Sequence, residues 1–103
     1  MNGAEETGGR QIVPGIFVSP AGQATVDPAL ADVLFDLAVQ LEDATPYPVD
    51  VQHVVAALLL ASRAGLITPD RALAADDAYL QVVLAEHVKT VFTTYGGKLG
   101  RDD

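Results

Sequence analysis

The sequence contains no cysteine. This absence excludes a disulfide framework, thiolate metal sites and cysteine nucleophiles, and it fits a reducing compartment. Basic residues are also scarce, because six Lys and Arg residues stand against fourteen Asp and Glu residues, which gives a formal net charge of −8. Binding to a phosphate backbone requires clustered Lys and Arg. The sequence therefore predicts no nucleic-acid partner.

Long apolar runs are absent as well. The uninterrupted run from Val54 to Ala61 is eight residues long, whereas a membrane span needs about 20. The first ten residues, M-N-G-A-E-E-T-G-G-R, lack the basic start and the apolar core of a secretory signal. We therefore predict a cytoplasmic protein without a membrane partner.

Few side chains could carry chemistry. Neither Ser19 nor Ser62 lies in the G-x-S-x-G context of a nucleophile elbow. The two histidines, His53 and His87, are too few for a carboxylate-bridged metal bundle, which uses about four carboxylates and paired Glu-x-x-His motifs. The sequence predicts no catalytic residue, no metal and no cofactor. One enzymatic alternative stays open, because Asp50 and His53 are three residues apart and share one face of a helix.

What the chain does contain is a dense apolar stretch from Asp50 to Gly65, D-V-Q-H-V-V-A-A-L-L-L-A-S-R-A-G. On a helix its larger side chains form an ordinary core face. The opposite side carries a second seam of mostly small side chains, here called the alanine seam, made of His53, Ala56, Ala57, Leu60 and Ala64. A helix that is apolar nearly all round is either fully enclosed or covered by a partner. A chain of 103 residues buries only about 60 to 70% of its unfolded surface, so the seam is predicted to dock.

The remaining patterns predict an all-α domain with a short N-terminal arm. Asp27-Pro28 is typical of a helix start, Pro46 and Pro48 end that helix, and Thr68-Pro69 restarts one. Asp76 or Asp77 caps the last helix, and whether residues 69–95 form one helix or two stays open. The predicted four helices cover residues 28–44, 50–64, 69–75 and 77–95.

The segments outside the helical domain, which spans residues 28–95, are predicted to be irregular or extended. Residues 1–10 and 96–103 are polar and are predicted to be tails. Residues 11–27 form an extended arm bent at Pro14-Gly15, with a possible hairpin between Ile16–Val18 and Ala24–Val26.

Residues 49–59, V-D-V-Q-H-V-V-A-A-L-L, resemble the helical repeat of Clp-type chaperone N-terminal domains. In that family a polar cap, an acid or amide and a histidine precede an L-L-x-A-L-L run. The resemblance covers about twenty residues with Leu66-Ile67, and a full family domain has two repeats where this chain has room for barely one. The resemblance implies an all-helical domain that binds adaptors or unfolded substrates.

The leading functional hypothesis is a non-enzymatic interaction module, adaptor or accessory subunit. Its alanine seam, with Ile16 and Phe17 of the arm, would dock on a larger protein or on a second copy of the chain. The predicted interface residues are Ala56, Ala57, Leu60, Ala64, His53, Ile16 and Phe17.

Two alternatives belong to other functional classes. Residues 27–50 carry six acids and no base, so the chain could be an inhibitor or immunity-type protein that binds a basic site on a target. The acidic face that would make this contact consists of Asp32, Asp36 and Asp43. The second alternative is a small enzyme that uses His53 with Asp50.

Overall fold

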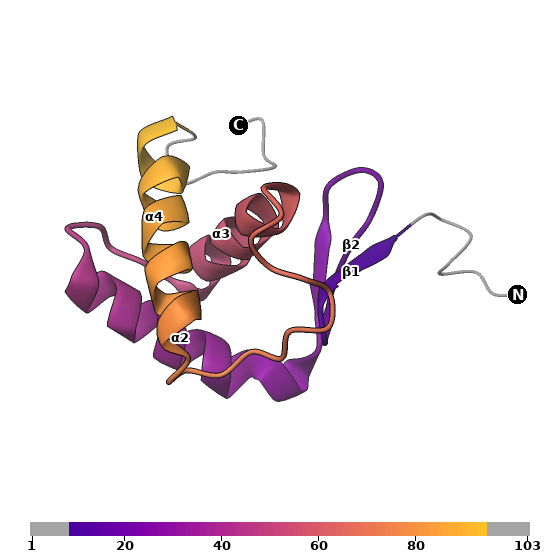
Figure 1. Ribbon diagram of the computed structural model, residues 1–103, viewed down its shortest axis with the longest axis horizontal. Coiled ribbons are helices and arrows are strands. Elements are labelled where there is room, and N and C mark those ends of the chain that lie inside the picture. The colour runs from indigo at the N-terminus through magenta and orange to yellow at the C-terminus, as the bar shows by residue number, and fades with distance from the viewer. Residues whose placement is uncertain (1–8, 95–103) are drawn as a thin grey trace, which may run out of the picture.

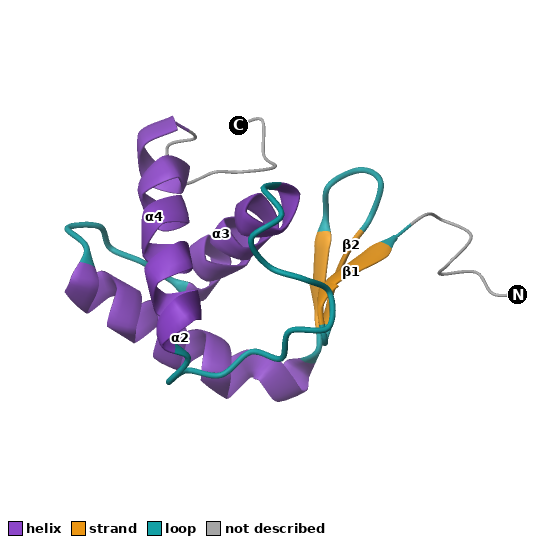
Figure 2. Ribbon diagram, viewed as in Figure 1, coloured by secondary structure: helices purple, strands orange, loops and turns teal. Residues whose placement is uncertain are grey.

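The computed structural model describes residues 9–94, with strands first and helices after them (Figures 1 and 2). The described elements are β1 (Arg10–Val13), β2 (Ile16–Val18), β3 (Ala24–Val26), the 3-10 helix η1 (Pro28–Leu30), α2 (Ala31–Ala44), α3 (Val51–Arg63) and α4 (Ala78–Thr94). Over residues 9–94 the fold is thus α+β, with three α-helices and one three-stranded antiparallel sheet. The predicted all-α four-helix bundle is wrong.

The sheet has the order β1-β2-β3, and both strand pairs are antiparallel. The predicted hairpin is confirmed, since Ile16 lies opposite Val26 and Val18 opposite Ala24. The bend at Pro14-Gly15 joins β1 to β2, as predicted. An isolated hairpin is marginal in water, and three strands packed on helices overcome that limit.

The segment predicted to be an arm belongs to the hydrophobic core. Ile12, Val13 and Ile16 are fully buried, and β1 contacts α3. The all-α prediction failed here because short β-branched runs do not reveal from sequence that they will pair with one another and cover a helix. Arg10, predicted to lie in the tail, begins β1, and residues 1–8 and 95–103 lie outside the described residues.

Two glycines shape the turns of the sheet. Gly15, between β1 and β2, has φ +94°, and Gly22, between β2 and β3, has φ +88°. The carbonyl of Gly15 accepts a hydrogen bond from the Asp27 N–H at 2.8 Å, which ties the end of β3 to the first turn. A Cβ added to Gly15 would lie 2.6 Å from Leu30 Cδ1, whereas one added to Gly22 would meet nothing within 4 Å.

The capping signals act at the predicted positions, although the predicted helix 28–44 begins as the 3-10 helix η1 and becomes α2 only at Ala31. Asp27 accepts the Ala29 N–H at 2.9 Å, and Pro28 begins η1, which leads directly into α2. At the end of α3, Gly65 N–H donates to the Ser62 carbonyl at 3.1 Å and Leu66 N–H donates to the Ala61 carbonyl at 3.0 Å. This hydrogen-bond pattern is a Schellman motif.

The helix predicted at residues 69–75 does not form, and residues 64–77 are an irregular connection. The Thr68 hydroxyl donates to the Asp70 carboxylate at 2.6 Å instead of capping a helix. Arg71 binds both carboxylate oxygens of Asp77, at 3.0 and 2.8 Å, and its guanidinium lies over the Tyr79 ring. Seven residues are too few for a stable helix without packing, because helix nucleation is unfavourable. Residues 69–94 therefore contain a single helix, α4.

Asp77 is the residue that starts α4. Its Oδ1 accepts the N–H groups of Tyr79 and Leu80 at 3.0 and 3.2 Å. Partial burial raises the pKa of Asp77, but these bonds and Arg71 outweigh that effect, so the pKa lies below its ordinary value. The Tyr79 hydroxyl also donates to the Leu66 carbonyl at 2.8 Å, which ties the connection to the helix.

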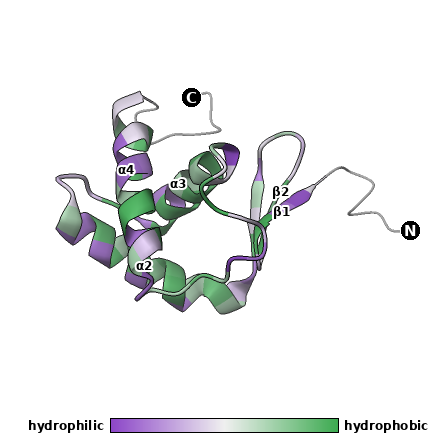
Figure 3. Ribbon diagram, in the orientation of Figure 1, coloured by the Kyte–Doolittle hydropathy of each residue, from purple (hydrophilic) through white to green (hydrophobic). Residues whose placement is uncertain are grey.

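The core lies around α3, which contacts α2, α4 and β1. The inward faces of these elements are hydrophobic in Figure 3. The largest fully buried side chains come from the sheet and from all three helices: Ile12, Ile16, Leu34, Leu37, Leu41, Leu58, Leu80 and Leu84. β1 thus covers part of α3, in addition to the cover that α2 and α4 provide.

The two turn glycines yield a matched stability test. Both Gly15→Ala and Gly22→Ala force a residue with a Cβ into positive φ, which costs about 1 kcal/mol each. Gly15→Ala should lower the free energy of unfolding somewhat further, because the partly buried Leu30 side chain must also move. Urea unfolding of both variants measures the difference. Equal losses would show that the Leu30 contact is unimportant.

Candidate functional site

Asp50 and His53 form a capping box at the start of α3. Asp50 Oδ1 accepts the Val51 N–H at 2.8 Å, and the Asp50 N–H donates to His53 Nδ1 at 2.9 Å. Since Nδ1 accepts this bond, the folded state holds a neutral ring with its proton on Nε2. The histidine thus takes the place that Glu or Gln usually occupies in a capping box.

The His53 ring also packs against α4. It is 9% exposed, and its centroid lies 4.4 Å from that of Phe92. Phe92 in turn stacks on Tyr47 of the α2–α3 connection, with ring centroids 5.0 Å apart and planes 6° apart. Burial lowers the pKa of His53, and the charge of Asp50 opposes this shift only in part.

The contacts of His53 and Asp50 are those of a helix cap. A catalytic His-Asp pair needs the carboxylate to accept a ring N–H, whereas here the Asp50 backbone N–H donates to the ring. Within residues 9–94, no group of three or more His, Cys, Asp or Glu side chains could hold a metal ion. His87 lies on α4, where its Nδ1 is 2.8 Å from the Val83 carbonyl.

The alanine seam lies mostly against the chain itself. Ala57 is fully buried, His53 is nearly so, Ala56 and Leu60 are half-buried, and Ala64 is exposed. The contact between His53 and Phe92 shows that α4 covers this side of α3. Small side chains allow helices to approach closely, so the seam accommodates a neighbour from the same chain.

Of the two predicted interface residues in the arm, one lies in the core and the other on the surface. Ile16 is fully buried, whereas Phe17, the next residue on β2, is 48% exposed. Alternation along a strand explains the difference, because successive side chains point to opposite faces of the sheet.

The outer side of α2 is where the structure exposes apolar side chains next to acids. Phe35 is 59% exposed and Val39 is 46% exposed. Their spacing of four residues places them about 40° apart on the helix. Gln40, which accepts a hydrogen bond from Gln81 of α4 at 2.6 Å, is about 140° from Phe35 on the same helix. The apolar pair is therefore on the flank of α2 that points away from α4.

The predicted acidic residues border this pair. Asp32, Asp36 and Asp43 are all exposed, and helical spacing places them beside Val39, on the side opposite Phe35. Glu42, also exposed, borders Phe35 from the other side. We call this surface the α2 face: Asp32, Phe35, Asp36, Val39, Glu42 and Asp43.

Sequence reasoning found the acids of the α2 face and missed its apolar residues. Helical spacing places Phe35 and Val39 between the apolar and the acidic sides of this helix, and aromatics at helical spacing are usually core. A signal was present, because both residues lie between acids that must reach solvent. Other large apolar side chains of the described residues are exposed as well: Tyr79 and Val82 lie three residues apart on α4, and Val82 is the most exposed of them, at 67%.

The neutral His53 cap should make stability depend on pH. Above the ordinary histidine pKa of 6.5 the contribution of the neutral cap to the free energy of unfolding is fully present. As the pH falls below that value the unfolded chain takes up a proton that the folded chain resists, so the free energy of unfolding falls through the lowered pKa of His53. Urea unfolding at about pH 7.5 and about pH 5.5 should show this loss.

Two variants isolate the effect of His53. His53→Gln keeps an acceptor at the same helix position and does not titrate, so it should lose less unfolding free energy between the two pH values. His87→Gln leaves the cap intact and should lose as much as the wild type. The same loss in His53→Gln as in the wild type would contradict a titrating cap.

Across residues 9–94 the structure contains no helix that is both long enough and apolar enough to cross a bilayer. Comparisons with protein-family models, with curated proteins and with solved structures found no match to this chain. The resemblance of residues 49–59 to a Clp-type repeat stays a prediction, and the function has to be argued from the residues of the chain itself.

Proposed function

We propose that this protein is a non-enzymatic interaction module that docks through the α2 face on a partner protein with a basic surface around an apolar pocket. The observation that carries the proposal is the exposure of Phe35 and Val39 among carboxylates on one flank of α2. Exposed aromatic side chains are the usual anchors of interfaces, and an acidic rim attracts and orients a basic partner.

The chemistry of the α2 face argues against a second copy as the partner. A twofold contact places the same surface on both sides, so Asp32, Asp36 and Asp43 would face their own copies. Like charges brought together across an interface are strongly unfavourable. A net charge of −8 adds repulsion between whole molecules. A different, basic protein is the better fit.

The alanine seam, by contrast, offers a partner little surface. Of its five residues only Ala64 is exposed, and α4 already lies over His53. Docking through the buried residues of the seam, His53 and Ala57, would require α4 to separate from α3, which would expose fully buried side chains of α4 such as Leu80, Leu84 and Val88. Exposing three such side chains costs several kcal/mol, at about 1.5 to 3 kcal/mol each.

A pair of matched variants tests the docking proposal. The tagged wild type, Phe35→Ser and Val82→Ser are used to isolate partners from the native source in parallel. A specific partner should be retained by the wild type and by Val82→Ser, and lost by Phe35→Ser. With that partner purified, calorimetry should show Phe35→Ala to bind about 10- to 100-fold more weakly, the range of a central anchor.

The charge component has a separate test. Replacing Asp32, Asp36 and Asp43 by Asn should weaken binding and flatten its dependence on salt, because exposed charges are screened by ions. If the Asn variant loses binding while Phe35→Ser retains it, the protein is an acidic inhibitor of a basic site and the apolar anchor is refuted. If no protein distinguishes the wild type from Phe35→Ser, the docking proposal fails.

A further inference from the structure

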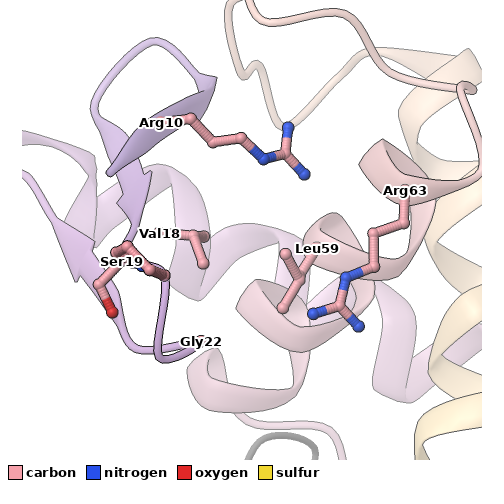
Figure 4. A pocket seen from close by; sticks show the side chains of 7 residues that line it. Arg10, Val18, Ser19, Gly22, Leu59 and Arg63 are labelled. Carbon is pink, nitrogen blue, oxygen red and sulfur yellow. The ribbon is translucent and has the colours of Figure 1, made fainter. Parts of the chain in front are cut away.

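A pocket of about 290 Å³ lies between the β2–β3 turn and the second half of α3 (Figure 4). Its wall on one side is Val18, Ser19, Pro20 and Gly22, and on the other side Leu59 and Arg63, with Arg10 at its edge. None of these residues belongs to α2, so the pocket is separate from the α2 face. Pockets for small ligands begin at about 300 Å³, so this one has room for a short molecule.

Two arginines from different elements line the pocket, one on either side of Leu59. Arg10 extends from β1 toward α3, and Arg63 lies on the other side of Leu59 (Figure 4). Within residues 9–94 the single ion pair joins Arg71 to Asp77, so no described acid neutralises either arginine. The described range holds only four Lys and Arg residues, and half of them meet at this pocket.

The floor between the arginines is apolar. Val18 and Leu59 are each 7% exposed and belong to the hydrophobic core. The Ser19 hydroxyl is engaged locally, where it accepts the Gln23 N–H at 3.2 Å. A ligand that fits this pocket therefore needs a negative group that binds the guanidiniums. It also needs an apolar part that lies against Val18 and Leu59.

The size of the pocket favours a carboxylate as the negative group. A guanidinium fork matches both carboxylate and phosphate, and the carboxylate is the smaller group, which suits a volume of about 290 Å³.

We infer that the pocket binds a monocarboxylate with a short aliphatic chain. The carboxylate binds at the guanidinium groups that line the pocket, and the aliphatic chain lies against Val18 and Leu59. Two sources share this chemistry: a free short-chain acid, and the C-terminal residue of a peptide whose last side chain is aliphatic.

Titration of the full-length protein with hexanoate, followed by amide NMR, tests the site. Hexanoate should shift the amides of residues 18–22 and 59–63 in a saturable way, while hexanol and inorganic phosphate should not. Arg10→Gln and Arg63→Gln should each weaken hexanoate binding by about threefold to tenfold, the range for an exposed charged contact. Lys89→Gln, which removes an exposed cation on α4, should leave it unchanged.

Several outcomes would overturn the inference. They are the absence of saturable shifts at these amides, equal binding of hexanol, stronger binding of phosphate, or wild-type affinity in both arginine variants. Because Arg10 and Arg63 are exposed, these variants should fold, and the amide spectrum itself verifies that.

A short peptide ending in leucine identifies the source. If the peptide with a free C-terminal carboxylate binds more tightly than hexanoate and the amidated peptide does not bind, the pocket recognises a protein C-terminus. Hexanoate binding without peptide binding assigns it to a free acid.

Discussion

The burial of α3 is the constraint on which the other elements depend. The helix is apolar on nearly every side, and Val54, Ala57, Leu58 and Ala61 have no exposed surface. Covering such a helix requires neighbours in several directions. In this chain α2, α4 and β1 all contact it. The sheet is present because two further helices alone leave part of α3 uncovered, and three short strands provide that cover with few residues.

The start of α3 is linked to its surroundings through one ring. His53 accepts the backbone N–H of Asp50 and contacts Phe92, which stacks on Tyr47. A single neutral imidazole thus joins a helix cap to the packing of α4 and of the α2–α3 connection. Because a proton on Nδ1 would remove the acceptor, the cap and the aromatic packing respond to the same titration. The polar residue of the alanine seam therefore stabilises the fold where a docking role was expected.

Local signals were read correctly wherever the deciding interaction is local. The Asp27 and Asp50 caps, the stop at Gly65 and the β2–β3 hairpin all depend on residues within a few positions of one another. The fold class depends on contacts that are distant in sequence, such as β1 on α3, and the sequence pattern does not contain them. The segment 69–75 failed for a related reason, since Arg71 is held by Asp77 and Tyr79 in the loop.

The candidate surfaces also differ from prediction because burial depends on contacts between residues that are distant in sequence. A seam on α3 can be assigned to a partner only if no other part of the chain covers it, and α4 does so at His53. Phe35 and Val39 are exposed for the converse reason, because the flank of α2 that carries them receives no cover from α4.

The charges of the described chain are divided between two surfaces. Acids surround the apolar pair of α2, and two arginines face the pocket between the β2–β3 turn and α3. Separation of opposite charges is costly in a small protein unless each group stays hydrated or meets an external partner. Arg71 and Asp77 demonstrate the alternative, in which opposite charges pair within the chain at 2.8 Å. Within residues 9–94 the acids of α2 and the arginines of the pocket form no such pair, so both surfaces keep their charge exposed to solvent.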